Sequence, residues 1–88
     1  MNYTVVWTQD AYQSLLDLAS SVLATQQLID AVDDIHRRLG EDPHKQGESR
    51  PGNRRIMFSS PLGVIFRIDI RLQQVVISEA WGYLPRNE

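Results

Sequence analysis

The stretch Leu62-Gly63-Val64-Ile65-Phe66-Arg67-Ile68-Asp69-Ile70 decides the fold of this 88-residue chain. In it, one set of apolar residues alternates with a more polar set: Val64, Phe66, Ile68 and Ile70 against Ile65, Arg67 and Asp69. A period of two is typical of a strand with one face on the core and the other toward solvent. The stretch therefore predicts a strand of an antiparallel sheet, with Arg67 and Asp69 on its open face.

Strand-like segments flank this stretch on both sides. Arg54 to Phe58 precedes it across the turn Ser59-Ser60-Pro61, and Gln74 to Trp81 follows it after Arg71-Leu72-Gln73. Connections this short join antiparallel neighbours. The segment Glu41 to Gly52 contains two prolines and two glycines and no apolar run, so we expect a loop there.

A short strand and two amphipathic helices come before the sheet segments. Tyr3 to Trp7 is β-branched and aromatic, and Thr8 is a natural N-cap for the helix that follows it. Helical spacing predicts two apolar faces, first Ala11, Leu15, Leu18, Ala19 and Val22, then Leu28, Ala31, Val32, Ile35 and Leu39. Ser20-Ser21 weakens the first helix and suggests a break or a tight turn. The second helix is expected to run from about Ala24 to Leu39, with Gly40 as its C-terminal stop.

The resulting order is β-α-α-β-β-β. Two consecutive amphipathic helices must bury their apolar faces on something else, and the sheet is the available partner. We therefore predict a single α+β domain over residues 1–88, a helical hairpin packed on a small, mainly antiparallel sheet.

Composition excludes several classes of site. The chain has no cysteine, which rules out disulfides, cysteine-ligated zinc and a thiol nucleophile. Because it also has no Gly-rich phosphate loop and no carboxylate cluster with metal-ligand spacing, we expect no cofactor and no metal. The N-terminus lacks signal-peptide features, and no window is apolar enough to span a membrane. We expect a cytoplasmic protein without a membrane partner.

The net charge of −2 is unevenly distributed. Residues 1–40 carry a net −3, whereas residues 41–88 carry a net +1. The basic side chains Lys45, Arg50, Arg54 and Arg55 stand against Glu48 alone between His44 and Arg55. Such a strip can bind a phosphate backbone or an acidic peptide. On charge alone, a solvated loop at the sheet edge is the commoner explanation.

The available side chains suit one chemistry, the metal-independent cleavage of a phosphodiester. That reaction needs cations on the phosphate, a base for the 2′-hydroxyl and an acid for the leaving oxygen. The candidate catalytic residues are Arg55, Arg67, Tyr83 and Glu48, with His44 as an alternative base, and the candidate RNA- or partner-binding residues are Lys45, Arg50, Arg54 and Trp81. Each has a structural alternative: Arg67 can pair with an acid on a neighbouring strand, Trp81 can fill the core, and Tyr83 can cover the sheet edge.

Several short motifs, in order and at the right spacing, resemble the RelE/ParE superfamily of bacterial toxins, the toxic halves of type II toxin–antitoxin pairs. They are Val5-Val6-Trp7-Thr8-Gln9-Asp10-Ala11, Ile35 with Arg38-Leu39, Asp42-Pro43, Arg55-Ile56-Met57-Phe58, Leu62 to Ile68, and Val75-Val76-Ile77. The segment Gly47-Glu48-Ser49-Arg50 is similar to the branch labelled plasmid stabilization proteins. Gly63 stands where the RelE-like pattern usually has an arginine.

The resemblance implies a β-α-α-β-β-β fold and a role in growth regulation. The activity it implies first is that of an mRNA interferase, a RelE-like endoribonuclease that cleaves message on the ribosome. A ParE-like inhibitor of DNA gyrase without a catalytic site of its own is an alternative, and a non-toxic or degenerate protein-binding module is another. A homodimer and a heterotetramer with the antitoxin are both compatible with the resemblance.

The resemblance also implies a cognate antitoxin, which we expect to be acidic, partly disordered and folded upon binding. The strip from Lys45 to Arg55 is the expected contact for its acidic side chains. Charge reversal at Arg54 and Arg55 should therefore weaken the complex, as calorimetry would measure. Unchanged affinity would contradict this assignment.

Overall fold

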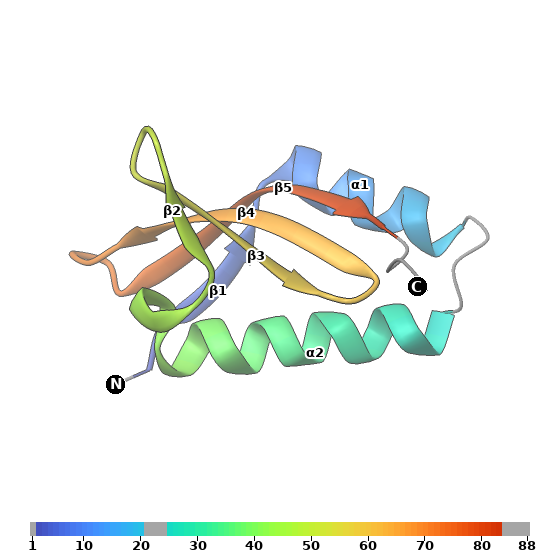
Figure 1. Ribbon diagram of the computed structural model, residues 1–88, viewed down its shortest axis with the longest axis horizontal. Helices are drawn as coiled ribbons and strands as arrows, with labels where there is room; N and C mark the ends of the chain where they lie inside the picture. Colours follow the sequence, from blue (N-terminus) through green and yellow to red (C-terminus); the bar gives the residue numbers. More distant parts are fainter. Residues whose placement is uncertain (1, 21–24, 84–88) are drawn as a thin grey trace.

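The computed structural model describes residues 2–20 and 25–83, and these residues form two layers, a sheet and a pair of helices (Figure 1). The elements in order are β1 (Thr4–Trp7), α1 (Gln9–Ala19), α2 (Thr25–Glu41), the 3-10 turn η1 (Pro43–Lys45), β2 (Glu48–Arg50), β3 (Arg54–Ser59), β4 (Leu62–Asp69) and β5 (Gln74–Gly82). The predicted α+β class and β-α-α-β-β-β order are confirmed, with β2 as an addition. None of these helices is long and apolar enough to cross a membrane.

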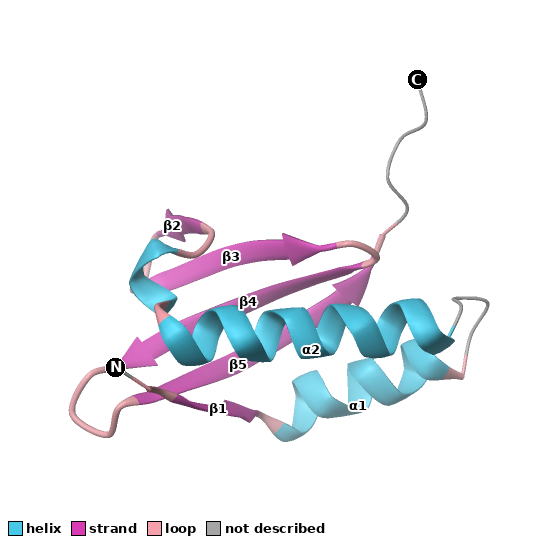
Figure 2. Ribbon diagram, turned by 90° about the horizontal axis from the view of Figure 1, so that it is seen from below, coloured by secondary structure: helices cyan, strands magenta, loops and turns pink. Residues whose placement is uncertain are grey.

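The strands lie side by side in the order β1-β5-β4-β3-β2. β1 runs parallel to β5, and every other neighbouring pair is antiparallel. Figure 2 shows α2 lying across one face of this sheet, with α1 beside it near β1 and β5. The face opposite α2 is called the open face below.

The core forms where β4 meets α2. Leu62, Val64 and Phe66 of β4 are completely buried, as the alternation in the sequence predicts. Their buried partners are Leu28, Ala31, Ile35 and Leu39 on α2, Met57 on β3, and Val75 and Ile77 on β5. Ile70 was expected to continue this face, but β4 ends at Asp69 and the Ile70 side chain is 67% exposed.

The start of α1 agrees with the sequence prediction, whereas the end of α2 differs from it. The Thr8 hydroxyl accepts a hydrogen bond from the amide of Ala11 (3.2 Å), so Thr8 is the N-cap of α1 as predicted. The prediction that Gly40 stops the second helix is wrong, because α2 runs on to Glu41. Gly40 does not adopt the left-handed conformation of a C-terminal stop, and its carbonyl accepts from the amide of Tyr3 (2.8 Å). The predicted boundary residues Ser21, Val22 and Ala24 lie outside the described residues, as does the tail from residue 84 onward.

The segment Glu41 to Gly52 is not the continuous loop that was expected, because it contains η1 and β2. β2 pairs with β3 through Glu48–Ile56, Ser49–Arg55 and Arg50–Arg54. Gly47 makes this pairing possible, since it has a positive φ of 66° and a Cβ there would collide with the carbonyl of Ile56. β2 therefore forms because Gly47 lets its backbone come close to β3, and not because its residues alternate between apolar and polar.

Asp34 fastens α2 to the end of β3. Its carboxylate accepts from the hydroxyl of Ser59 (2.8 Å) and from the guanidinium groups of Arg37 (2.6 Å) and Arg38 (3.2 Å). The bond from Ser59, together with these two cations, holds the pKa of Asp34 below its ordinary value. Arg38 also donates to the side chain of Gln46 (2.9 Å), which links α2 to the segment that leads into β2.

His36 fastens α2 to β1. The indole Nε1 of Trp7 donates to Nε2 of His36 (2.8 Å), and the two rings are stacked with centroids 6.0 Å apart. This bond requires that Nε2 carry no proton. Partial burial lowers the pKa of His36 from its ordinary value of 6.5, and the carboxylate of Asp33 opposes that shift.

The lowered pKa of His36 predicts a pH-dependent stability. Below pH 6.5 the unfolded chain binds a proton at His36 more readily than the folded chain does. The free energy of unfolding should therefore fall as the pH is lowered through 6.5 toward the folded-state pKa. His36→Gln keeps an acceptor for Trp7 but does not titrate, so its denaturation midpoints should vary less between roughly pH 7.5 and 5.5. Equal slopes for the two proteins would contradict the role of His36.

Candidate functional site on the open face of the sheet

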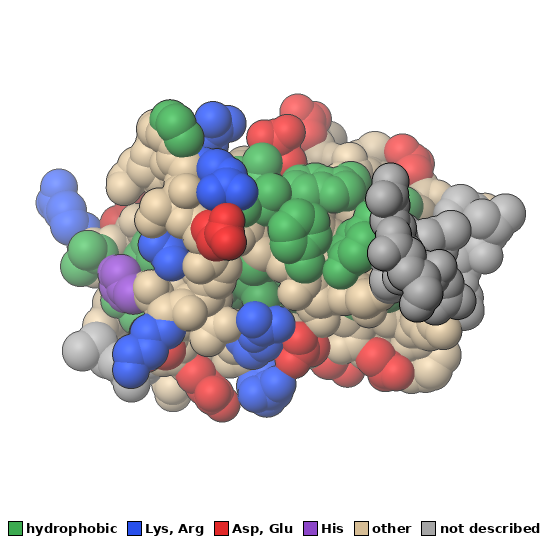
Figure 3. All heavy atoms as spheres, in the orientation of Figure 1, with side chains coloured by type: hydrophobic (Ala, Val, Ile, Leu, Met, Phe, Trp, Pro, Cys, Tyr) green, Lys and Arg blue, Asp and Glu red, His purple; other side chains and the backbone are tan. Residues whose placement is uncertain are grey.

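The open face is defined by the strand register. Met57 pairs with the buried Val64, so its neighbours on β3 point the other way. The side chains that share the open face are Glu48 and Arg50 from β2, Arg54, Ile56 and Phe58 from β3, Ile65 and Arg67 from β4, and Glu79 and Trp81 from β5. Figure 3 shows hydrophobic side chains gathered over β4 and β5, with lysine and arginine side chains toward the β2 end.

Three aromatic side chains, Phe58, Trp81 and Tyr83, form what we call the aromatic cluster. Phe58 contacts both of the others edge-on, with ring centroids 6.0 Å from Trp81 and 5.4 Å from Tyr83. Tyr83 lies beyond the last strand, but its amide donates to the carbonyl of Pro61 (2.9 Å), which fixes its position. Phe58 remains 50% exposed, so the cluster presents an apolar surface to solvent.

Gly63 is the platform on which Trp81 lies. The two residues are paired across β4 and β5, and a Cβ on Gly63 would lie 2.7 to 2.8 Å from atoms of the indole ring. Any side chain at position 63 would therefore displace Trp81. The glycine that departs from the RelE-like pattern is explained by this contact, because an arginine and a flat-lying tryptophan cannot share the space.

Three arginines lie at the β2 end of the open face, and we call them the basic row: Arg50, Arg54 and Arg67. Arg50 and Arg54 are directly paired across β2 and β3, an arrangement in which like charges repel. Arg50 is ion-paired with Glu48 (3.2 Å). Within residues 2–20 and 25–83, neither Arg54 nor Arg67 has a carboxylate partner, so the row favours an anionic ligand.

The structure brings most of the predicted site residues to this face. Arg67, Tyr83 and Glu48 from the predicted catalytic set lie there, as do Arg50, Arg54 and Trp81 from the predicted binding set. Trp81 is only partly buried and packs on the surface rather than filling the core. Arg67 pairs across β5 with Val76, so its cross-strand neighbour there is not an acid.

Arg55, Lys45 and His44 lie elsewhere. Arg55 points to the opposite face, where its guanidinium donates to the carbonyls of Gln46 (2.9 Å) and Gly47 (3.3 Å) and to the Ser49 hydroxyl (2.9 Å). Lys45 belongs to η1 and is 3.8 Å from Asp42. Because Arg55 holds the segment before β3 in place, reversing its charge would also loosen that segment. Arg54 alone is the cleaner test of the antitoxin contact.

Sequence reasoning missed the apolar centre of this face, which consists of Ile56, Phe58 and Ile65. In Arg54 to Phe58, apolar residues occupy both even and odd positions, so the sequence pattern does not say which of them face outward. The only clue was the register with β4, which a single sequence does not display. In the described part of the chain no group of His, Asp and Glu is arranged to hold a metal ion.

Solved structures were found that share this fold. A chain of the toxin–antitoxin complex RelBE2 from Mycobacterium tuberculosis matches with a TM-score of 0.77 and 22% identity, over 93% of this chain and 99% of that one. A chain of the intact Escherichia coli RelBE complex gives a TM-score of 0.66 and 14% identity (96% and 99% covered). A chain of the ParDE system of Pseudomonas aeruginosa gives 0.62 and 17% (93% and 97% covered).

At these identities the matches establish the fold, which is that of the RelE and ParE toxins, as the sequence resemblance implied. No protein-family model matches the sequence, and no curated protein is similar enough in sequence to count as a relative. The arrangement of side chains on the open face must therefore decide what the surface can do.

The contact between Gly63 and Trp81 is directly testable. Gly63→Ala should push the indole off β4 and lower the free energy of unfolding by about 1–3 kcal/mol, the usual cost of overpacking. Tryptophan fluorescence reports the movement when Trp7 is replaced by phenylalanine, because Trp81 is then the only tryptophan. Gly40→Ala is the matched control, since among the residues that the structure describes its new Cβ would meet only the Tyr3 carbonyl, at 3.5 Å. An unchanged Trp81 spectrum in Gly63→Ala would refute the contact.

Proposed function

We propose that this chain is the toxin of a type II toxin–antitoxin pair and that it acts by binding its target through the open face. The observation that carries the proposal is the aromatic cluster beside the basic row, on the sheet face opposite α2. Aromatic anchors bordered by arginines are the features that dominate binding energy in protein interfaces. The fold shared with toxin–antitoxin structures supports the toxin role.

The composition of the open face favours binding over catalysis. A nuclease needs an acid and a base converging on one phosphate. Here the side chains at the centre are Ile56, Phe58 and Ile65, which can neither donate nor accept a proton. Glu48 is held by Arg50 at 3.2 Å, and Tyr83 packs against Phe58. A ParE-like inhibitor of DNA gyrase, which needs a surface and no catalytic site, is accordingly the proposed mode of action.

A RelE-like endoribonuclease is the second candidate, and the basic row favours it. Arg54 and Arg67 stand without carboxylate partners among the described residues, and guanidinium groups are well suited to phosphate. In that case Tyr83 would be the proton donor, and Trp81 would stack on a base. The required message would be ribosome-bound, as the resemblance implies.

A different surface is proposed as a further binding site for an antitoxin partner. Tyr12, Leu16 and Ile29 are large apolar side chains that are 42% to 52% exposed, and they border a groove between α1 and α2. Exposed apolar patches of this kind mark protein interaction sites. The structures that share the fold include toxin–antitoxin complexes, which supports a partner that covers such a surface.

Induced expression of the chain without a partner tests the proposal. Wild type should arrest growth, and Phe58→Ala should need at least about tenfold more protein for the same arrest, since a central aromatic anchor is worth 2 kcal/mol or more. Because Phe58 is half-exposed, its truncation should cost the fold less than the truncation of a buried core residue. Tyr12→Ala is the matched control, because it removes an equally exposed aromatic ring from α1.

Two assays then separate the modes of action. Loss of DNA supercoiling by gyrase in the presence of the purified chain, with message intact, supports the proposed mode. Cleavage of ribosome-bound message in primer extension, abolished by Tyr83→Phe, would replace it with the ribonuclease. Normal growth at high expression would contradict a toxin of either kind and leave a protein-binding module.

A further inference from the structure

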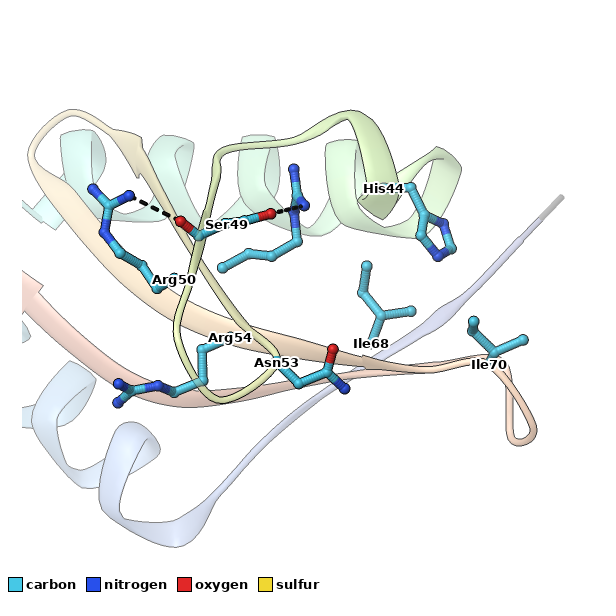
Figure 4. A pocket seen from close by; sticks show the side chains of 8 residues that line it. His44, Ser49, Arg50, Asn53, Arg54, Ile68 and Ile70 are labelled. Atoms are coloured by element: carbon cyan, nitrogen blue, oxygen red, sulfur yellow. Dashed lines mark hydrogen bonds between the residues drawn. The ribbon is translucent and has the colours of Figure 1, made fainter.

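A second polar site lies on the other side of the β2–β3 hairpin, where α2 ends and no longer covers the sheet. It is a cavity of about 360 Å³ lined by His44, Ser49, Arg50, Asn53, Arg54, Arg55, Ile68 and Ile70. Figure 4 shows His44, Ile68 and Ile70 around the space beneath the hairpin, while Arg50 and Arg54 reach away from His44. The volume is within the range of small-ligand sites in proteins.

Arg55 is the fixed cation of this cavity. A guanidinium has five N–H donors, and three of those of Arg55 are used on Gln46, Gly47 and Ser49. These bonds hold the side chain in one orientation and leave one N–H on each terminal nitrogen for a ligand. Within the described ranges no carboxylate is ion-paired with Arg55. A preorganised, uncompensated guanidinium is a strong anion anchor.

The remaining polar groups of the lining are also donors. The Ser49 hydroxyl accepts from Arg55 and so keeps its own proton for a ligand, and the Asn53 amide and the His44 imidazole each carry an N–H. Among residues 2–20 and 25–83, no acidic side chain lines the cavity. An excess of donors matches a phosphate, which offers three acceptor oxygens, better than a carboxylate, which offers two.

The floor of the cavity is apolar, and this places a second requirement on the ligand. Ile68 is partly buried, and Ile70 is 67% exposed although it is a large aliphatic side chain. Neither would gain from an inorganic anion, but both offer a surface to a flat, largely apolar ring. We propose that this pocket binds a nucleotide phosphate, with Arg55 as the anchor and the base lying over Ile68 and Ile70.

Arg50 and Arg54 of the basic row also line the pocket, so it adjoins the open face, but its anchor Arg55 does not lie on that face and the proposed function does not use it. Ser49 and Arg55 are paired across β2 and β3, and their side chains lie on the side of the hairpin opposite Glu48 and Ile56. No member of the aromatic cluster lines the cavity. The nucleotide can come from a free pool or from a nucleic-acid strand, because both present the same phosphate chemistry.

Titration of the full chain with AMP, adenosine, inorganic phosphate and a short single-stranded RNA tests the proposal. We expect AMP to shift the backbone amide resonances of Ser49 and Asn53 and the Nε resonance of Arg55, and to bind more tightly than phosphate, whereas adenosine should not bind. Asn53→Asp should weaken AMP by about fivefold or more, because one added negative charge near the phosphate costs about 1 kcal/mol. Asn53 has a positive φ of 63°, which aspartate also tolerates.

Two control variants locate the binding. Gln27→Glu adds the same charge at the far end of α2, and Arg67→Gln removes a cation from the open face; both should bind AMP as the wild type does. RNA that shifts the same resonances identifies a nucleic-acid strand as the source, and binding of AMP alone identifies the free nucleotide. No binding of AMP, phosphate or RNA, or AMP affinity lost in Arg67→Gln, would overturn the proposal. A glutamate-rich peptide that binds with the same dependence on Asn53, where AMP does not, would overturn it too.

Discussion

The burial of one face of β4 against α2 is the constraint from which the rest of the structure follows. Leu62, Val64 and Phe66 are fully buried, and residues between them must then point the other way. The neighbouring strands pair with β4, with one register shift on β5 between the partners of Ile65 and Phe66, so they take the same division into two faces. The aromatic cluster and the basic row are therefore placed by the packing of side chains on the opposite side of the sheet.

The contact of Gly63 with Trp81 shows how one substitution can change the character of such a face. A residue with a side chain at position 63 of β4 would project from the open face, and the RelE-like pattern usually has an arginine at this position. Glycine leaves room for the indole to lie on the backbone instead. A cationic centre and an aromatic centre exclude one another sterically. The glycine at position 63 thus counts against a ribonuclease and in favour of a surface that binds a partner.

Much of this architecture could be predicted from the sequence because it rests on local patterns. The apolar face of α2, the Thr8 cap and the alternation of β4 each depend on residues close together in the chain. β2 could not be predicted, since its three residues are all exposed and it forms through the approach of Gly47 to β3. The same holds for the direction of Phe58. Both alternating sets of β3 residues include apolar side chains, so the pairing of β3 with β4 decides which set faces outward.

The β2–β3 hairpin explains how a chain with a net charge of −2 presents two basic surfaces. Arg54 and Arg55 are consecutive on a strand, so their side chains leave it on opposite sides. Arg54 joins the basic row on the open face and also lines the pocket beneath the hairpin, whereas Arg55 is the anchor of that pocket. On α2, the carboxylate of Asp34 is bound to Ser59, Arg37 and Arg38. Charge that cancels in the total is therefore separated in space, and anionic partners respond to the local field at the hairpin rather than to the sum.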